Sequence, residues 1–325
     1  MALQTHPHLT TSACKSLFLL HEANPAEGRG VEDGYNLDGI SANITATLAD
    51  RYGNLVPDGT AVSFRNEGGL SSINPSCTTT GGKCSVVFSG SGTRPTDGRL
   101  TVLATAVGEE SFTDANGNGI FDAAETFVDL PEAFIDGDED GTRDTAPAEE
   151  FVDFNNDGLY NLADSSFNGI LRSSPSIAST TLSVRSSVVQ VLSGSDAFFN
   201  LDLSTLNPTN PPIAAAELNP IALDCSAGGA VSRLIRVTDA RGQVMPAGTT
   251  VAFASSAGTI TSIPTTFVVP NTNNKLIQIY PVSIRSSALP LCATAPTNGS
   301  GTLTVTVRTP GGVTTILGVG VTDSL

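Results

Sequence analysis

The strongest constraint on this chain is a segment of fifteen residues that occurs twice without gaps. Residues 50–64 read DRYGNLVPDGTAVSF, and residues 239–253 read DARGQVMPAGTTVAF. The two segments are identical at seven of the fifteen positions and lie at a constant offset of 189 residues. Self-similarity of this kind indicates two copies of one structural unit. A chain of 325 residues is long enough for two or three domains with cores of their own.

Both copies have the pattern of short β-strands joined by turns. ISANITATLAD precedes the first copy and VSRLIRVTD lies before the second, and both alternate apolar with polar side chains. Inside the repeat, D-x-x-G is a turn signal, and TAVSF or TTVAF directs Val and Phe to one face of a strand. Similar alternating segments recur every 8–15 residues. The sequence therefore predicts an all-β chain of tandem sandwiches, with Phe64 and Phe253 at equivalent core positions.

The repeat resembles a known family. The strand ending in D-x-x-G-N, the following V-P-D-G-T-x-V-x-F and the later G-x-x-T-V-x-A are similar to bacterial Ig-like domains of group 1. These are the modules of invasin- and intimin-type surface proteins. The resemblance covers residues 38–108 in the first copy; in the second it covers 231–262 and extends more loosely to 323. It implies tandem immunoglobulin-like β-sandwiches on a bacterial surface, without catalysis.

The expected domain organisation follows from the repeat and the composition. An N-terminal extension over 1–36 could supply an edge strand. The first sandwich spans 37–204 and is interrupted by an acidic, loop-rich insert over 109–169. Residues 205–220 are rich in proline and are expected to form a semi-rigid linker. The second sandwich spans 221–325.

The insert carries the whole net charge of the protein. Residues 109–164 contain 17 of the 32 acidic side chains and one basic side chain, Arg143. The rest of the chain has 15 acidic and 15 basic residues, so it is neutral. A concentrated acidic patch indicates a cation as partner, and nucleic acid is excluded because no basic stripe could neutralise phosphates. No apolar run reaches 18 residues, so no membrane span is expected.

Within the insert, residues 114–125 match a calcium-loop pattern at every specified position. The segment DANGNGIFDAAE fits D-x-[DN]-x-[DN]-G-x5-E. Alternate side chains point oxygens inward, Gly119 allows the sharp turn, and Ile120 offers its carbonyl. The predicted Ca²⁺ ligands of this first loop are Asp114, Asn116, Asn118, Ile120, Asp122 and Glu125.

Two further segments match the pattern less completely. The second loop, 136–147, has Pro147 in the closing position, where Glu149 or Glu150 could substitute. Its predicted ligands are Asp136, Asp138, Asp140, Thr142 and Asp144. The third loop, 153–164, ends in an Asp, which is one methylene shorter than the usual Glu. Its predicted ligands are Asp153, Asn155, Asp157, Leu159, Asn161 and Asp164.

A further periodicity accompanies the loops. ESFTD, ETFVD, EAFID and EEFVD each combine an acid, an aromatic residue and an Asp. Their aromatic residues could form a small core between metal loops: Phe112, Phe127, Phe134 and Phe151. Flanking helices are not expected, and the loops resemble the calcium loops of dockerin or of thrombospondin type 3 repeats. The alternative is a disordered acidic loop, because Asp, Asn and Gly are also ordinary turn formers.

The five cysteines give information about the redox compartment in which the protein acts. Cys77 and Cys84 bracket a turn signal, and a short disulfide there is expected, with a second between Cys225 and Cys292 and Cys14 left over. Two disulfides would imply an oxidising compartment, whereas five reduced thiols are the alternative. The N-terminus lacks the pattern of a signal peptide, so we expect a fragment of a longer exported protein or a misassigned start.

No catalytic constellation is visible in the sequence. Its three His residues lie near no Cys or Ser motif, and no G-x-S-x-G, H-E-x-x-H or phosphate-binding loop occurs. A glycosidase carboxylate pair is the weaker interpretation of the acids. The leading hypothesis is a non-enzymatic, calcium-binding structural or adhesive module outside the cell or on a bacterial surface. The alternatives are a subunit of an extracellular filament or matrix that assembles through strand edges, and an accessory glycan-binding domain.

Overall fold

The computed structural model of the chain describes residues 18–22, 34–69, 71–173, 178–200, 219–225, 230–275, 278–287 and 299–324. These residues form β-strands and one 3-10 turn, Glu67–Gly69, and contain no α-helix. None of the helical structure in these ranges is long and apolar enough to cross a membrane. The chain divides into two compact units, with the principal boundary between residues 190 and 191. The all-β prediction is confirmed.

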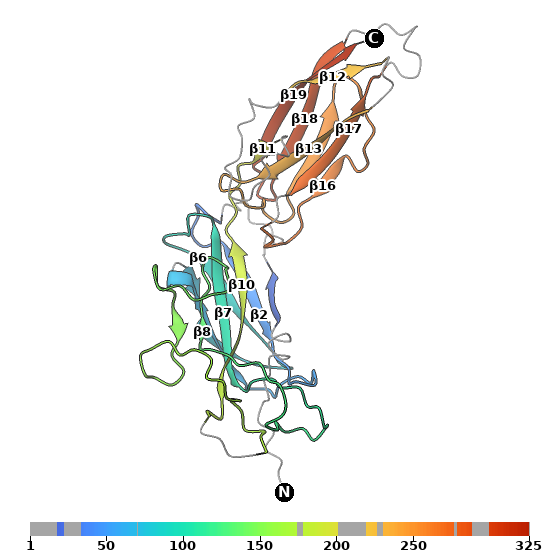
Figure 1. Cartoon of the computed structure of the whole chain (residues 1–325). Coiled ribbons are helices and arrows are strands. Elements are labelled where there is room, and N and C mark those ends of the chain that lie inside the picture. Colours follow the sequence, from blue (N-terminus) through green and yellow to red (C-terminus); the bar gives the residue numbers. More distant parts are fainter. Residues whose placement is uncertain are drawn as a thin grey trace. The chain divides into compact units, whose positions relative to one another are not determined.

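The first unit contains two four-stranded sheets (Figure 1). One has the order β1 (Phe18–Glu22), β2 (Ser41–Thr47), β6 (Lys83–Gly90) and β4 (Ser71–Ile73). The other has the order β10 (Leu182–Val191), β7 (Arg99–Gly108), β3 (Ala61–Asn66) and β5 (Ser76–Thr78). Alternate residues are buried along β2, β3 and β6, as expected when two sheets each turn one face to a shared core.

The second unit repeats this arrangement. Its first sheet has the order β11 (Phe198–Asn200), β13 (Ala230–Thr238), β17 (Ile279–Arg285) and β15 (Thr259–Ile260). Its second sheet has the order β12 (Ile221–Asp224), β19 (Thr314–Ser324), β18 (Gly299–Arg308), β14 (Thr250–Ser255) and β16 (Thr266–Val268). A single cluster of buried apolar side chains from both sheets forms its core.

The fifteen-residue repeat forms the same turn in both units. The Asp50 carboxylate accepts hydrogen bonds from the amides two and four residues later, and the Asp239 carboxylate does the same. Gly53 and Gly242 follow at φ values of 83° and 79°, which residues with a Cβ rarely adopt. The spacing of Asp and Gly that the two copies share therefore forms the same carboxylate-capped turn in each unit.

The strand after the turn is also equivalent in the two units. Phe64 lies in β3 and Phe253 lies in β14, and their rings are 3% and 6% exposed. β3 lies between β7 and β5, and β14 lies between β18 and β16. The two Phe residues therefore occupy the same place in the same topology, as the repeat predicted.

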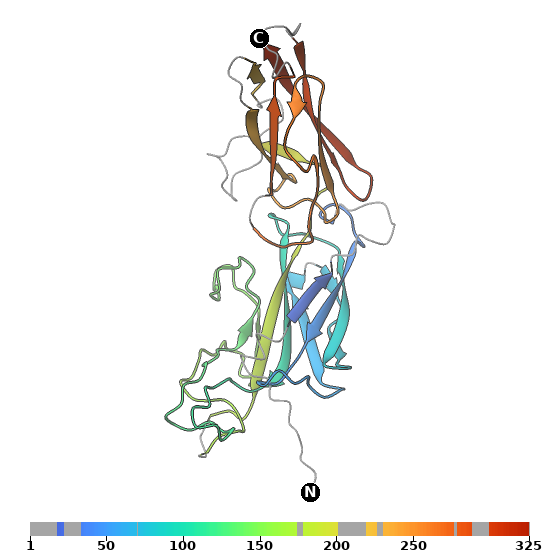
Figure 2. The ribbon, with the colours of Figure 1, turned by 90° about the vertical axis from the view of Figure 1, so that its right-hand side faces the viewer.

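The insert replaces a hairpin turn of the first unit. In the second unit, β18 and β19 are joined by the short turn 309–313, closed by hydrogen bonds between Thr309 and Val313. Their counterparts β7 and β10 are separated by residues 109–181, which carry β8 (Ala133–Phe134) and β9 (Phe151–Val152). Figure 2 shows these residues, in green, beside β7 and β10 and away from β2. The insert thus emerges between β7 and β10 of the first unit.

The insert covers the outer face of β7. Nearly every residue of β7 is buried, including both faces of the strand. On the outer face, Leu103 packs with Ala133 of β8, with Ile135 directly after β8, and with Val152 of β9. The Thr101 hydroxyl also donates to the Asp136 carbonyl at 2.8 Å. The insert is therefore packed on the sheet and is not a detached loop.

Some expected boundaries differ from the structure. β1 pairs with β2, so the N-terminal extension supplies an edge strand. β11 pairs with β13 of the second unit, so residues 198–200 do not belong to the first sandwich, which was expected to reach 204. This boundary is invisible in the sequence because an edge strand carries the same alternation in either sandwich. Residues 205–218 of the expected linker, 205–220, lie outside the described residues.

One predicted disulfide is present. Cys77 and Cys84 are bonded, across the turn between β5 and β6. Cys225 is also disulfide-bonded. Cys14 and Cys292 lie outside the described residues, so the pairing of Cys225 with Cys292 stays a prediction.

Replacing Phe64 or Phe253 by Ala is expected to lower the free energy of unfolding of its own unit by about 3–5 kcal/mol, because each ring is buried in a sandwich core. Denaturant unfolding measures the loss. Val87→Ala is the matched control, since Val87 is 48% exposed on β6 and should change stability by no more than about 0.5 kcal/mol. Equal losses for Phe64→Ala and Val87→Ala would contradict the assigned core.

Candidate metal centre

The first loop is folded by its own carboxylate and amide oxygens. Asp114 accepts the amide of Asn118 at Oδ1 (3.1 Å) and that of Gly119 at Oδ2 (2.8 Å). The Asn118 side chain in turn accepts the amide of Ile120 at 2.9 Å. Gly119 has a φ of 80°, which allows the sharp turn between these contacts. The side chains predicted to bind a cation are therefore drawn to one side of a compact loop.

The second and third loops have the same pattern. The opening carboxylates, Asp136 and Asp153, each accept the amides four and five residues later, at 3.0 and 2.9 Å and at 3.1 and 2.8 Å. Asp140 and Asp157, at the fifth position, accept the amide two residues on at 2.7 and 2.8 Å. The sixth position is a glycine with φ of 84° or 77°. All three predicted loops therefore have one backbone conformation in this part.

A glutamate closes the first loop. Glu125 accepts the amide of Ala115 at Oε1 (2.7 Å) and the amide of Asp122 at Oε2 (3.0 Å). These are the second and ninth positions of the loop, so one carboxylate holds its two halves together. Glu125 lies at the twelfth position, where the sequence pattern expects it.

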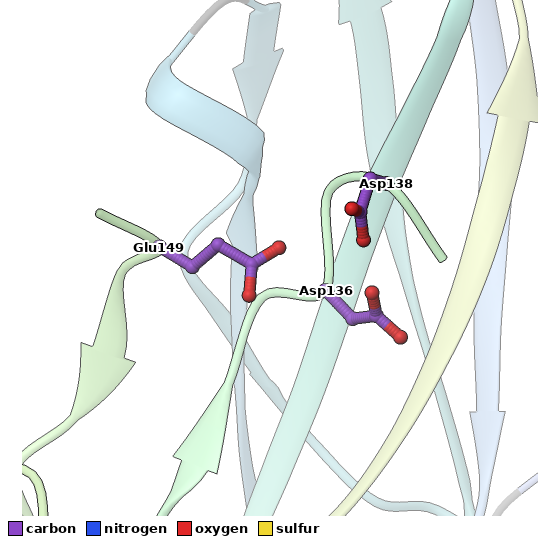
Figure 3. A group of neighbouring side chains, drawn as sticks. All are labelled: Asp136, Asp138 and Glu149. Carbon is purple, nitrogen blue, oxygen red and sulfur yellow. The ribbon is translucent and has the colours of Figure 1, made fainter. Parts of the chain in front are cut away.

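In the second loop this place is taken by Glu149. Its Oε1 accepts the amide of Gly137 at 2.6 Å and its Oε2 accepts that of Asp144 at 3.0 Å, again the second and ninth positions. The carboxylates of Asp136, Asp138 and Glu149 come within 4.8 Å of one another (Figure 3). Of the two acids that could substitute for Pro147, the structure brings in Glu149.

In the third loop the closing carboxylate comes from elsewhere in the chain. The amides of Phe154 and Asn161, at the second and ninth positions, donate to Oε1 and Oε2 of Glu132 at 2.8 and 3.0 Å. Asp164, which the sequence placed in this role, instead accepts hydrogen bonds from Ser166 and Asn168. A continuous twelve-residue pattern cannot include Glu132, because Glu132 lies 21 residues before Asp153.

The loop oxygens are held as charged acceptors. A hydrogen bond from Ser173, followed by those from Asn116 and Asn118, keeps the pKa of the Asp122 carboxyl below its usual range. The Thr142 hydroxyl and amide lower the pKa of Asp140. These hydrogen bonds therefore favour the charged form of Asp122 and Asp140, the form that binds a hard cation.

Two arginines hold the loops against aromatic rings. Arg51, from the carboxylate-capped turn of the first sandwich, contacts Asp114 at 3.2 Å and lies 3.9 Å from the centre of the Phe112 ring. The equivalent residue of the second unit, which has no insert, is Ala240. Arg143 lies over Phe151, with its guanidinium carbon 4.9 Å from the ring centre. Arg51 therefore anchors the first loop to the sandwich.

The four phenylalanines expected to form one small core form two. Phe112 and Phe127 face each other across a β-bridge and pack with two further rings, Phe121 and Phe167. Phe134 and Phe151 pair between β8 and β9 and pack on Tyr160. The insert thus consists of two short ribbons, each with its own ring cluster.

The donor set fits calcium. The predicted side-chain ligands of the three loops, with the glutamates that close them, all offer carboxylate, amide or hydroxyl oxygens. No Cys or His is among them. Ca²⁺ takes six to eight oxygen ligands in flexible geometry, and the seventh-position carbonyls of Ile120, Thr142 and Leu159 belong to the same pattern. Zinc prefers nitrogen and sulfur ligands, so these loops suit it poorly.

Comparisons with known proteins give little guidance. No family model matches the chain, and no curated protein matches its sequence. Similar solved structures include the D0-D1 domain of intimin (13% identity, 91% of this chain and 93% of that one, TM-score 0.21). The adhesin InvE of Yersinia pseudotuberculosis is another (12%, 95% and 58%, TM-score 0.27), and so is a 1.5-MDa bacterial ice-binding adhesin (12%, 94% and 63%, TM-score 0.20). At these TM-scores the similarities carry no argument about this chain.

Glu149→Gln and Glu132→Gln are each expected to weaken calcium binding at one loop by roughly 10–100-fold. A glutamine has one acceptor oxygen, so one backbone amide loses a charge-assisted hydrogen bond. Calorimetric titration of calcium measures the effect. Glu150→Gln is the control. It removes the same charge at the exposed residue next to Glu149. A loss with Glu150→Gln as large as that with Glu149→Gln would show that only net charge matters.

Proposed function

We propose that this chain is a non-enzymatic, calcium-binding structural or adhesive module that acts outside the cell or on a bacterial surface. The observation that carries the proposal is the repetition of one hydrogen-bond pattern in three loops, each closed by a glutamate on its second and ninth amides. Ordinary acidic turns have no reason to share such a long-range contact three times. Calcium would fold the insert into a rigid attachment on the first sandwich.

The ligands of each site follow from the pattern. Glu125, Glu149 and Glu132 would each close one site with a carboxylate. The remaining ligands would be the predicted side chains of each loop and its seventh-position carbonyl. The third site would thus take Glu132 in place of Asp164. Two of the three sites would be closed by residues outside their twelve-residue loops.

The electrostatics make calcium necessary for a compact insert. Residues 109–164 carry a net charge of −16, with Arg143 as their one basic residue. Like charges at this density oppose compaction. A divalent cation in each loop would remove two charges while it satisfies oxygens already turned inward. Its role would be structural, and no residue of the loops needs a catalytic task.

The Cys77–Cys84 disulfide supports an oxidising compartment. Calcium is abundant outside cells, and loops in extracellular modules bind it with dissociation constants on the order of 0.1–1 mM. Disulfide and calcium loops therefore favour the same location.

The alternatives receive less support. A filament subunit would need a strand to donate, and the N-terminal strand β1 already pairs with β2 of its own chain. An accessory glycan-binding domain would need a platform of exposed aromatic rings. The aromatic rings of the insert instead pack on one another in two clusters.

Removal of calcium is expected to expand the insert and leave both sandwiches folded. At ten times the dissociation constant, each occupied site adds about 1.4 kcal/mol of stability, so chelation should lower the melting temperature visibly. Limited proteolysis with and without chelator should show new cleavage between Glu110 and Asn168 only.

Magnesium and sodium chloride at matched ionic strength are the controls, because general screening would protect the insert equally in all three salts. An unchanged protease pattern, together with no heat of calcium binding at millimolar concentrations, would defeat the proposal.

A further inference from the structure

The insert contains four copies of the motif E-x-F-x-D, and three sites do not account for all of its acids. The copies span Glu110–Asp114, Glu125–Asp129, Glu132–Asp136 and Glu149–Asp153. Three of the glutamates close a loop, and three of the aspartates open one. The motif therefore provides the last acid of one site and the first acid of another. Glu110 and Asp129 are left without a site.

The ribbons explain how the motif is used. Two copies pair antiparallel at Phe134 and Phe151, and the other two at Phe112 and Phe127. Antiparallel pairing brings the Glu of one copy to the Asp of its partner at each end. Both ends of the Phe134–Phe151 ribbon carry a loop. The Phe112–Phe127 ribbon carries the first loop at one end, and its other end brings Glu110 to Asp129.

Glu110 makes the contacts of a closing glutamate. Its Oε1 accepts the amide of Leu130, the residue after Asp129, at 2.7 Å. Its Oε2 accepts the amide of Asn168 at 2.7 Å, and its own amide donates to the Asn168 carbonyl at 3.0 Å. The closing glutamates of the three loops all make this last contact with the ninth-position carbonyl. Asn168 therefore occupies the ninth position of a discontinuous site.

Asp129 makes the contacts of an opening aspartate. Its Oδ1 accepts the amide of Asp164 at 3.2 Å and its Oδ2 that of Ser165 at 2.7 Å. The Asp164 carboxylate accepts the amide of Ser166 at 2.8 Å, as fifth-position side chains do in the other loops. Ser165 has a φ of 61°, where the three loops have glycine. Residues 164–168 thus reproduce positions five to nine of a calcium loop.

A buried oxygen at this cluster lacks a partner. Asn168 is 7% exposed, and its side-chain Oδ1 has no hydrogen bond. Its Nδ2 donates to the Ser166 carbonyl at 3.1 Å and to Asp164 at 3.3 Å, so the amide lies among the oxygens of the cluster. A half-turn of the amide would break these two Nδ2 hydrogen bonds and turn Oδ1, which has no bond to lose, toward the Ser166 carbonyl and the Asp164 carboxylate. A cation there would satisfy Oδ1, the Ser166 carbonyl and the Asp164 carboxylate together.

The negative charges around Glu110 also favour a bound cation. Burial, with Asp129 and Asp164 as negative neighbours, raises the pKa of Glu110 to about 7, although two backbone amides oppose this shift. Glu110 is 1% exposed. A buried carboxylate therefore has two further carboxylates as neighbours, one half-buried and one exposed, and a divalent cation would compensate their charge.

We propose that Glu110, Asp129, Asp164, the Ser166 carbonyl and Asn168 form a fourth calcium site, assembled from three separate segments of the insert. The inference rests on the calcium-binding function proposed above and extends it to a site that no continuous loop forms. With Glu110 bidentate, these groups supply six oxygens, within the range that Ca²⁺ accepts. The site joins the first and last turns of the insert to the connection between its ribbons.

The number of bound calcium ions tests the site. At the lowest calcium concentration that fills every wild-type site, native mass spectrometry should find four ions in the wild type, three in Asp129→Asn, three in Glu132→Gln and two in the double variant. Asp196→Asn is the control, because it removes an exposed carboxylate outside the insert and should leave four ions.

Three ions in both the wild type and Asp129→Asn would overturn the fourth site alone. No bound ion in the wild type would overturn the proposed function, and this site with it.

Asn168→Asp gives a second test that does not depend on removing a ligand. Without calcium, the added carboxylate should lower the melting temperature, because it joins three others. With calcium, it should raise the affinity of one site by about tenfold or more, since ligand charge tunes calcium affinity. The melting temperature should then rise more on calcium addition than in the wild type.

Asn43→Asp, an equal charge change on an exposed position of β2, should show neither effect. If Asn168 only stabilises the turn, Asn168→Asp will lose the same stability with and without calcium, and the site is overturned.

Discussion

The insert depends on one contact: a glutamate carboxylate that accepts two backbone amides from separate parts of the chain. The insert has only two short ribbons and two small ring clusters, so hydrogen-bond ladders and a hydrophobic core satisfy few of its backbone groups. Buried or half-buried amides need partners, and here carboxylates supply them. The same carboxylates repel one another, so the calcium binding that we propose would couple the fold of the insert to a cation. Glu110, Glu125, Glu132 and Glu149 each have this dual role.

The sandwich determines where such a structure can be accommodated. In the second unit the turn between β18 and β19 is short and tight, and in the first unit its counterpart holds the insert. A hairpin turn tolerates insertion because its two strands stay paired whatever joins them. The outer face of β7 then carries Leu103, which the β8–β9 ribbon covers. The first unit also has Arg51 where the second has Ala240, so the repeated turn itself is adapted to hold the first loop.

Local sequence signals predicted much of this and failed where ligands are not contiguous. The repeat predicted Phe64 and Phe253 as equivalent core residues, because alternation and turn chemistry are local. The opening halves of the loops were visible for the same reason. Glu132 was invisible to a twelve-residue template because it reaches the third loop from upstream, whereas Asp164, at the twelfth position, accepts hydrogen bonds from Ser166 and Asn168. The E-x-F-x-D repetition contained the missing signal, but pairing of its copies had to be known before each Glu could be assigned to a site.

The four sites differ in what a cation would accomplish. The first and second sites close loops that are local in sequence, so a cation there orders a short segment. The third and fourth join segments far apart: Glu132 with 153–161, and Glu110 with Asp129 and 164–168. Closing a longer loop restrains more of the unfolded chain, although the free energy grows only logarithmically with length. A cation at the fourth site would therefore help to define how the two ribbons sit together, whereas cations at the first, second and third sites would complete the ends of ribbons already formed. A module stiffened in this way would respond to calcium as one unit, because each E-x-F-x-D strand contributes to two sites and transmits the ordering of one to the other.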